Sequence, residues 1–264
     1  MPAPDLAAHQ REWEAIASLD PHWAVLSDSG HKFGRWDDRE FFATGEREVA
    51  DRLRAGAQLG LPERHESALD FGCGLGRTAR ALGRRFGECV GVDISEEMVA
   101  RARELNASES SCRFVVNSGP DLSAFGDRSF DLVYSSIVLQ HMPSPEHVVL
   151  YLRELVRVLR DDGLLVFQLP SAAPLAVRLQ PRRNLYRLLR RLGLSPRFLY
   201  WRLGLHPMSM LALPRAEVVA VLEGAGATLV RVEEHPDPEF GVTNAAYYAR
   251  RGRRGPPLSS RRDG

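Results

Sequence analysis

The sequence predicts an α/β fold built on a mostly parallel sheet of seven strands, with helices before the sheet and an insert after its fifth strand. From residue 67 onward, short apolar runs alternate with amphipathic segments of helix length, as in parallel sheets joined by helical crossovers. The chain has 264 residues and is 44% hydrophobic, so it can bury a full core as a single unit.

Residues 1–60 are expected to form a helical cap ahead of the sheet. Residues 5–20 have the spacing of an amphipathic helix, with Trp13 on its apolar side, and 45–59 predict a second helix. The segment 22–44 holds too many aromatic residues for a solvated linker: Trp23, Phe33, Trp36, Phe41 and Phe42. Two interpretations stay open, namely a helical appendage packed on the main domain and a lid over a cofactor and a substrate.

Residues 61–250 are expected to form the main domain. Apolar runs predict its strands at 67–71, 89–93, 113–116, 130–135, 164–169, 227–234 and 244–250. Amphipathic runs predict its helices at 76–86, 96–105, 145–160 and 215–224. Strand and helix therefore alternate through most of the domain.

Residues 171–213 interrupt this alternation as an arginine-rich insert. Eight arginines and no acidic residue lie between Arg178 and Arg202, and a helix over 182–192 would place four leucines on one face. The insert is interpreted either as an amphipathic structural element with a solvated arginine face, or as a substrate cover or a surface for an acidic partner. The basic tail 251–264 is expected to be disordered.

Composition limits the partners and the location of the chain. A net charge of +1 argues against overall attraction to nucleic acid or to a membrane. Three cysteines without a C-x-x-C pair indicate neither a disulfide framework nor a zinc site. There is no apolar run of membrane-spanning length and no basic-then-apolar leader pattern, so we expect a cytoplasmic protein. The oligomeric state is left open.

The stretch ALDFGCGLG, residues 68–76, is the most informative part of the sequence. A strand ends near Asp70, and three glycines at 72, 74 and 76 lead directly into a helix. Glycines let backbone N–H groups approach a ligand, and the helix start adds partial positive charge. The dinucleotide fingerprint G-x-G-x-x-G would need glycine at position 77, where Arg77 stands.

With Asp70 two residues before the first glycine, the stretch resembles motif I of class I S-adenosylmethionine (SAM)-dependent methyltransferases. The resemblance implies a Rossmann-like fold, SAM as the cofactor and methyl transfer as the reaction. It assigns cofactor contacts in this stretch to Asp70, Gly72, Cys73, Gly74 and Gly76. It covers residues 60–170 well and the last two strands more loosely.

A second anchor is Asp93, which ends the next strand 17 residues after Gly76. A carboxylate at this place can accept hydrogen bonds from both hydroxyls of a ribose, whether the ribose belongs to SAM or to NAD. Ile94 and Met98 follow where an adenine ring would need apolar cover. The glycine spacing, rather than Asp93, favours SAM.

The adenine pocket is expected after the third strand. By the resemblance, an acidic residue here usually accepts from the adenine amine and a nearby backbone N–H meets the ring. Aligning Leu122 with the family's apolar residue places Ser118 at the acidic position, which is a departure, and Asp121 can substitute for it. The residues assigned to this pocket are Asn117, Ser118, Gly119 and Leu122.

The segment 130–143, FDLVYSSIVLQHMP, resembles motif IV of the same family. The resemblance places Ser135 beside the methionine end of SAM, and Gln140 and His141 beside the transfer channel. No D/N-P-P-Y/F/W motif follows the strand, which disfavours nucleobase and protein-amide acceptors and favours a small molecule. The segment also lacks the clustered acids of a cation-dependent enzyme, so no metal is expected.

The expected reaction needs mainly alignment of the acceptor with the methyl group. A hydroxyl acceptor on a metabolite, natural product or sugar is favoured, with an amine or carbon acceptor as the alternative. His141 is the candidate general base because its ordinary pKa lies near neutrality, and His31 and His206 are further candidates. Two other classes stay open: an NAD-binding oxidoreductase, and a non-catalytic SAM- or nucleotide-binding module acting through the insert and the tail.

Overall fold

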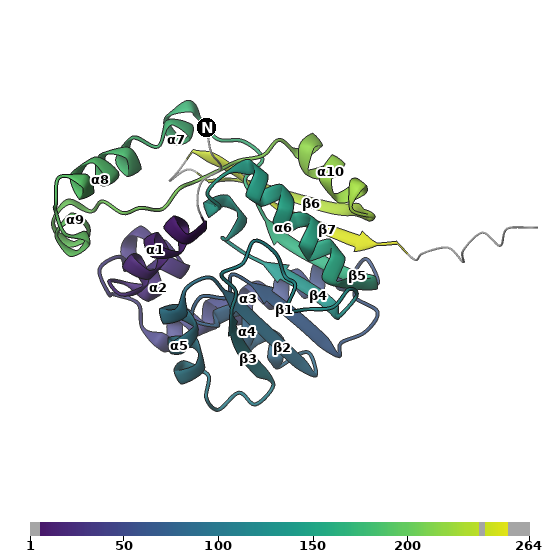
Figure 1. Ribbon diagram of the computed structural model, residues 1–264. Coiled ribbons are helices and arrows are strands. Elements are labelled where there is room, and N and C mark those ends of the chain that lie inside the picture. Colours follow the sequence, from purple (N-terminus) through teal and green to yellow (C-terminus); the bar gives the residue numbers. More distant parts are fainter. Residues whose placement is uncertain (1–5, 238–240, 253–264) are drawn as a thin grey trace, which may run out of the picture.

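The computed structural model describes residues 6–237 and 241–252, which contain a seven-stranded sheet flanked by helices (Figure 1). The strand order is β3-β2-β1-β4-β5-β7-β6, and only β7 runs antiparallel to its neighbours. The strands are β1 (Ser67–Phe71), β2 (Glu88–Asp93), β3 (Cys112–Val116), β4 (Phe130–Ser135), β5 (Leu159–Gln168), β6 (Ala227–Asp237) and β7 (Val242–Arg251). The predicted fold class is confirmed.

Helices connect the strands and also precede the sheet. They are α1 (Leu6–Ala17), α2 (Pro21–Val25), α3 (Asp38–Ala57), α4 (Arg77–Gly83), α5 (Glu96–Leu105), α6 (Pro145–Val158), α7 (Leu175–Leu179), α8 (Pro181–Arg191), α9 (Pro196–Leu203) and α10 (Arg215–Gly224). Two single 3₁₀ turns lie at Ser29–His31 and Leu139–His141. Within the described ranges, no helix is both long and apolar enough to cross a membrane.

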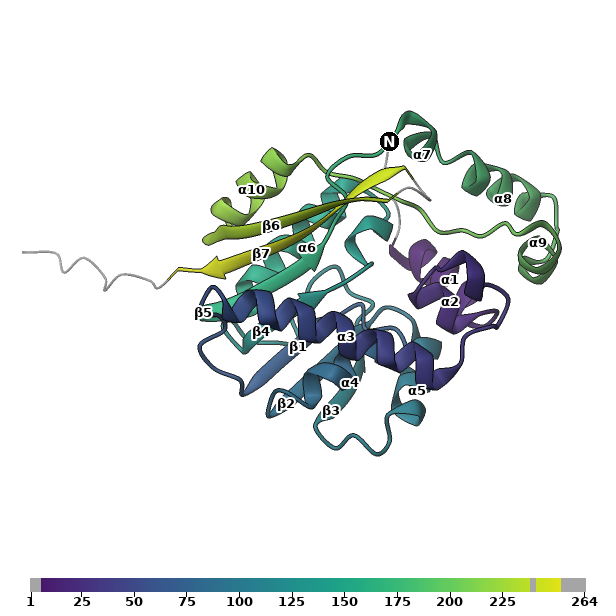
Figure 2. The same ribbon diagram turned by 180° about the vertical axis from the view of Figure 1, so that it is seen from behind.

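Each face of the sheet is covered by its own set of helices. One face packs on α6 and α10 through residues such as Leu155, Leu222 and Tyr247. The other face packs on α3, α4 and α5 (Figure 2). The side chains buried there include Val49 and Leu82. Both faces of the sheet are therefore buried from solvent, as is usual for a mostly parallel sheet.

The order in which strands are added to the sheet reverses after β3. The chain runs from β1 through β2 to β3 at one edge, and then returns to place β4 on the other side of β1. In sheets of this kind, ligands bind in the crevice at the carboxyl ends of the strands next to such a switch point. The glycine stretch follows β1 and therefore lies at this crevice.

Helices α1 and α2 form a small unit of their own with the start of α3, packed around Trp23, Phe41 and Tyr200. Tyr200 belongs to α9 of the insert and donates to Asp20 at 2.6 Å. The insert runs past α1 and α2 in both views (Figures 1 and 2). The first helices and the insert therefore hold each other.

Several element boundaries differ from the prediction. The predicted helix 45–59 begins earlier, at Asp38, because Asp37 caps it by accepting from the Glu40 N–H at 3.1 Å. The insert contains three helices where one was predicted, because Pro181 and Pro196 each start a new helix. Arg251, assigned to a disordered tail, instead ends β7 and donates to carbonyls including that of Leu159. The rest of the predicted tail, from 253, lies outside the described residues.

Candidate functional site

The glycine loop after β1 follows a backbone path that only glycine adopts readily. Gly72, Gly74 and Gly76 all have positive φ, at 76°, 51° and 82°. A Cβ at Gly72 would overlap the Val138 side chain, and one at Gly74 would overlap Val25. The loop is therefore packed between the β4 loop and α2, with no room for larger residues.

Asp93 at the end of β2 fixes this loop. Its two carboxylate oxygens accept from the Gly74 N–H at 2.9 Å and the Ser95 N–H at 3.0 Å. Burial raises the pKa of Asp93, although both N–H donors act in the opposite direction. The carboxylate also faces the cavity described below, and each of its oxygens keeps a further lone pair for a ligand donor.

Asp70 lies behind the loop rather than in front of it. It is buried and accepts from the Thr78 hydroxyl of α4 at 2.7 Å. Burial raises the pKa of Asp70 to about 7. Its place indicates that it orients the loop and the start of α4.

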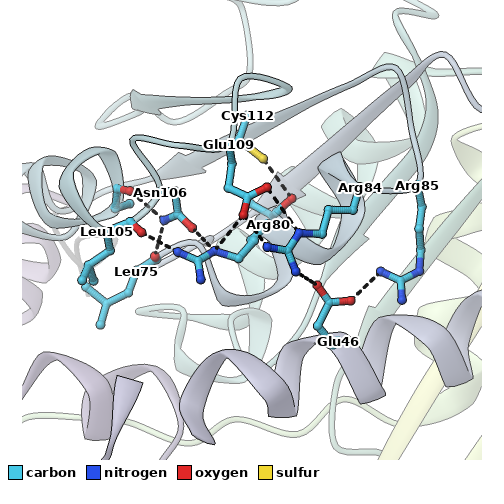
Figure 3. Close-up of polar contacts among 11 residues, drawn as sticks. Glu46, Leu75, Arg80, Arg84, Arg85, Leu105, Asn106, Glu109 and Cys112 are labelled. Carbon is cyan, nitrogen blue, oxygen red and sulfur yellow. Dashed lines mark hydrogen bonds and ion pairs between the residues drawn. The ribbon is translucent and has the colours of Figure 1, made fainter. Parts of the chain in front are cut away.

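A polar network supports the loop from the α5 side (Figure 3). Asn106 donates to the Leu75 carbonyl at 3.0 Å and accepts from Arg80 at 2.7 Å. Arg84 lies between Glu46 of α3 and Glu109, and pairs with both. The loop is thus tied to α3, α4 and α5 by named contacts, which keep its shape independent of a ligand.

A cavity enclosing about 730 Å³, including its open mouth, lies at the carboxyl ends of β1, β2 and β4. The predicted residues that line it are Gly72, Gly74, Asp93, Ile94, Met98 and Asn117. The structure therefore brings together the glycine loop, the carboxylate and the apolar pair around one space.

The remaining predicted cofactor residues do not line this cavity. Gly76 caps α4, and Cys73 and Leu122 are buried in the two cores. Ser118 is exposed to solvent, while the Gly119 carbonyl accepts from Tyr151, which does line the cavity. The others, Ser135 and Gln140, are buried beside the cavity walls.

Buried polar atoms without a partner lie beside the cavity. Among the described residues, these include Asn117 Nδ2, Ser135 Oγ and Gln140 Oε1. An unsatisfied buried polar atom costs free energy, so one that belongs to a cavity-lining residue indicates a place where a ligand supplies the partner. Asn117 Nδ2 is the clearest case because its residue lines the cavity.

His141 is buried, and its ring is held in one orientation by the insert. Its Nδ1 lies 2.5 Å from the Ser209 carbonyl, and because a carbonyl only accepts, Nδ1 bears the proton. Nε2 therefore has a free lone pair, and in the described part of the chain it has no partner. Burial lowers the pKa of His141 to about 4, so the ring is neutral near pH 7.

A second, smaller cavity of about 200 Å³ adjoins His141 and Ser209. His9 and Trp13 of α1 line both this cavity and the larger one. The Trp13 indole donates to His9 Nε2 at 3.0 Å, and its ring meets the His141 ring edge-on at 5.6 Å between centroids. Burial, followed by the nearby His141, lowers the pKa of His9 to about 3.

The two other candidate histidines lie elsewhere. His31 stacks on Trp36 at 3.8 Å between ring centroids and lines neither cavity. His206 packs edge-on against Trp23 at 5.2 Å, and burial lowers its pKa to about 3. Of the three histidines proposed as a base, only His141 borders one of the two cavities.

The sequence motifs assign no residue of α1 to the site. Leu6, His9 and Trp13 line the larger cavity, together with Ala24 and Val25 from α2. The spacing of His9 and Trp13, four residues apart on one predicted helix, is the signal that could have identified them. Their place is compatible with the lid interpretation of the first segment.

In the described residues, no group of three or more His, Cys, Asp or Glu side chains is arranged to hold a metal ion. A largely buried polar network centres on Glu48 of α3. Glu48 accepts from Arg77 at 2.7 Å and from the Tyr134 hydroxyl at 2.6 Å. This network ties α3 to β4 and to the start of α4.

The central part of the chain matches a known family model and several known proteins. Residues 69–167 match the family model described as a methyltransferase domain. The 2-methyl-6-phytyl-1,4-hydroquinone methyltransferase of Synechocystis sp. is 38% identical over 160 residues, which are 59% of this chain and 48% of that one. The chloroplastic tocopherol O-methyltransferase of Arabidopsis thaliana is 34% identical over 56% of this chain and 40% of its own. The chain thus matches about half the length of these relatives.

The fold also resembles that of solved structures. The magnesium protoporphyrin IX methyltransferase of Synechocystis PCC 6803, solved with bound SAH, superposes with a TM-score of 0.60. The match covers 94% of this chain and 99% of that one, at 17% sequence identity. At this identity, the likeness establishes the fold.

Proposed function

We propose that this chain, whose residues 69–167 are a methyltransferase domain, transfers a methyl group from SAM to a hydroxyl of a small organic acceptor. One observation supports this most directly. Asp93, the glycine loop and the unpartnered Asn117 amide all border the same cavity, at the switch point of the sheet.

The residues around the larger cavity fit the parts of SAM. Asp93 has lone pairs for ribose hydroxyls, and Ile94 and Met98 give apolar cover for a flat ring. Asn117 Nδ2 offers a buried donor that needs an acceptor such as a ring nitrogen. Gly72 and Gly74 line the same cavity, and the lack of a side chain lets their backbone approach the remaining polar part.

SAM, when bound, supplies a methyl group already activated as part of a sulfonium. The residues of this chain then have three tasks: to orient the acceptor, to exclude water and to take its proton. Trp13 and His9 separate the two cavities and limit water between them. His141 Nε2 is the proposed proton acceptor, because it is neutral, buried and without a partner in the described structure.

The acceptor is proposed to bind near the smaller cavity, beside His141. The relatives named above act on a hydroquinone and on a tocopherol by their names, and both are hydroxylated rings with an apolar chain. Apolar side chains of Ile16, Pro207 and Met208 line the smaller cavity and would contact such an acceptor. An amine or carbon acceptor is the second candidate, for which the neutral His141 would be less needed.

Two measurements test the proposal in order. Isothermal titration calorimetry is expected to show binding of SAM and S-adenosylhomocysteine, with NAD much weaker. NAD binding as tight as SAM binding would contradict the cofactor and favour an oxidoreductase. Methyl transfer is then assayed with tritiated SAM and pools of phenols, prenylated hydroquinones, amines and sugars. SAM binding without turnover on any pool would favour a non-catalytic module.

A further inference from the structure

The exposed apolar side chains of this molecule are concentrated in the insert. In the described part of the chain, ten large hydrophobic residues are exposed, and eight of them lie between 175 and 203. Leu175 and Leu192 are the most exposed, at 68% each. The eight are Leu175, Leu179, Leu185, Leu188, Leu192, Phe198, Trp201 and Leu203. We refer to them as the insert patch.

The insert patch is a second apolar face, distinct from the one that holds the insert in place. On α8, Leu185, Leu188 and Leu192 follow each other at steps of three and four and form one stripe. The neighbouring face is buried, with Tyr186 packed against Leu199 and Leu205. The insert therefore has its own small core and still presents leucines to the outside.

The charge around the insert patch has one sign. Between residues 171 and 216 there are nine arginines and no Asp or Glu. Arg183 and Arg187 pair with Glu12 of α1. The other seven, by contrast, are exposed and have no ion pair within the described ranges: Arg178, Arg182, Arg190, Arg191, Arg197, Arg202 and Arg215. The net charge of +1 for the whole chain conceals this local excess.

We propose that α7, α8 and α9 dock onto a lipid bilayer that carries anionic headgroups. An amphipathic helix with leucines on one face and arginines beside them lies in the plane of a membrane interface, with its apolar face below the headgroups. Basic residues near such a surface add favourable attraction to anionic lipid. Trp201 and Phe198 are side chains suited to the same interfacial zone.

A second copy of this chain would be a poorer occupant. Two such surfaces facing each other would bring together arginines without any acidic partner from residues 171–216. An acidic bilayer satisfies both the leucines and the arginines at once. The docking does not depend on the proposed reaction, because the insert patch shares no residue with either cavity.

Vesicle flotation of the full chain tests the proposal. Wild type is expected to float with vesicles of phosphatidylcholine and phosphatidylglycerol, and roughly tenfold or more weakly with phosphatidylcholine alone. High salt is expected to weaken the binding, since it screens the arginines. Equal binding to both vesicles, or to neither, would overturn the proposal.

Matched variants assign the binding to the insert patch. Leu188→Glu combined with Leu192→Glu is expected to reduce binding roughly tenfold or more. Leu150→Glu on α6 changes an exposed leucine outside the insert patch, at 45% exposure against 53% for Leu188, and is expected to leave binding intact. Arg191→Glu with Arg197→Glu is expected to act likewise, with exposed Arg64→Glu as the control.

Two readouts separate docking from misfolding and from self-association. The variants are expected to keep their circular dichroism spectra and thermal midpoints, because the altered side chains are exposed. Light scattering after size exclusion gives the oligomeric state. A wild-type dimer that Leu188→Glu converts to a monomer would overturn the lipid proposal in favour of a second copy.

Discussion

Asp93 has two roles in the site, and one substitution removes both. Its carboxylate orders the glycine loop through the Gly74 N–H and also faces the larger cavity. Asp93→Ala is expected to weaken SAM binding by about 2–4 kcal/mol, because two charge-assisted contacts are lost in a buried place. Titration calorimetry measures this loss.

Asp51→Ala is the matched control for Asp93→Ala. Asp51 is exposed on α3 and pairs only with Arg54, so SAM affinity is expected to stay at the wild-type value. Unchanged SAM affinity in Asp93→Ala would show that this carboxylate does not bind the ribose.

His141 gives a second prediction at this scale. His141→Ala is expected to lower kcat about 10²–10⁴-fold while SAM affinity stays the same, because a base acts on the acceptor proton. The pKa of His141 is about 4, so its neutral, proton-accepting form persists from neutral pH down to that value. The pH profile of kcat is therefore expected to show no fall near pH 6.5 from this group.

His31→Ala is the control, since His31 lies outside both cavities. If kcat falls equally in both variants, His141 only shapes the pocket. A fall of kcat near pH 6.5 in wild type would show that the group responsible has the ordinary pKa of histidine, and would contradict the lowered pKa of His141.

Individual site residues could be predicted where one local pattern defines them. Gly72, Gly74 and Asp93 follow strand ends in the sequence, and strand ends meet at one edge of a parallel sheet. Trp13 could not be assigned, because its contribution depends on how α1 folds back over the sheet. Ser118 illustrates the reverse case: alignment to a motif suggested a contact, whereas its side chain points to solvent.

The crossing of α3 and α4 gives a prediction at the scale of elements. A Cβ at Gly45 would overlap the Arg77 carbonyl, so these helices approach each other only because residue 45 is glycine. Gly45→Ala is expected to lower the free energy of unfolding by about 1–3 kcal/mol through overpacking. Urea unfolding measures it.

Gly224→Ala on α10 is the comparison, because nothing lies within 4 Å of a Cβ there. It is expected to leave stability unchanged or raise it by up to about 1 kcal/mol, through helix propensity alone. If both variants behave alike, the close approach of α3 to α4 does not limit stability.

The elements themselves were predictable where periodicity was long and regular, as in α6 and the strands. Helix α3 was predicted to begin seven residues late, because its first turns hold aromatic residues that resembled a loop. The signal for its true start was present, since Asp37 and Glu40 form a capping pair. In the insert, proline at a first helical position marked new helices rather than loops.

At the scale of the molecule, buried neutral histidines gather where the first helices meet the insert. His9 and His206 have pKa values lowered to about 3, and His141 to about 4. Their ordinary value in the unfolded chain is near 6.5, so below that pH the unfolded chain binds more protons. The stability from each histidine is therefore present above pH 6.5 and lost as the pH falls.

We expect the thermal midpoint to fall between pH 7 and pH 5, and His206→Phe to remove part of that fall. Each such histidine costs about 2 kcal/mol between pH 6.5 and pH 5, from 1.36 kcal/mol for each pH unit. Calorimetric scans at several pH values measure the difference. His65→Phe, at an exposed site, is the control for replacing a histidine by phenylalanine as such.

The architecture of the whole molecule followed from the alternation of strands and helices, and the family model agrees over 69–167. How α1, α2 and the insert join could not be predicted. The first helices and the insert are joined by contacts between residues far apart in the sequence. Examples are the ion pair of Arg183 with Glu12 and the hydrogen bond of Tyr200 with Asp20. No local pattern encodes contacts across that many residues.

The wall that His9 and Trp13 form between the two cavities has a thermodynamic consequence. A ligand in one cavity and a ligand in the other both contact the hydrogen-bonded His9–Trp13 pair, so the two do not bind independently. If the first ligand changes the affinity for the second by some factor, the second changes the affinity for the first by the same factor. This holds because the free energy of the doubly bound state does not depend on the order of binding. Synergy between cofactor and acceptor is thus expected to be symmetric, and Trp13→Ala to abolish it in both directions.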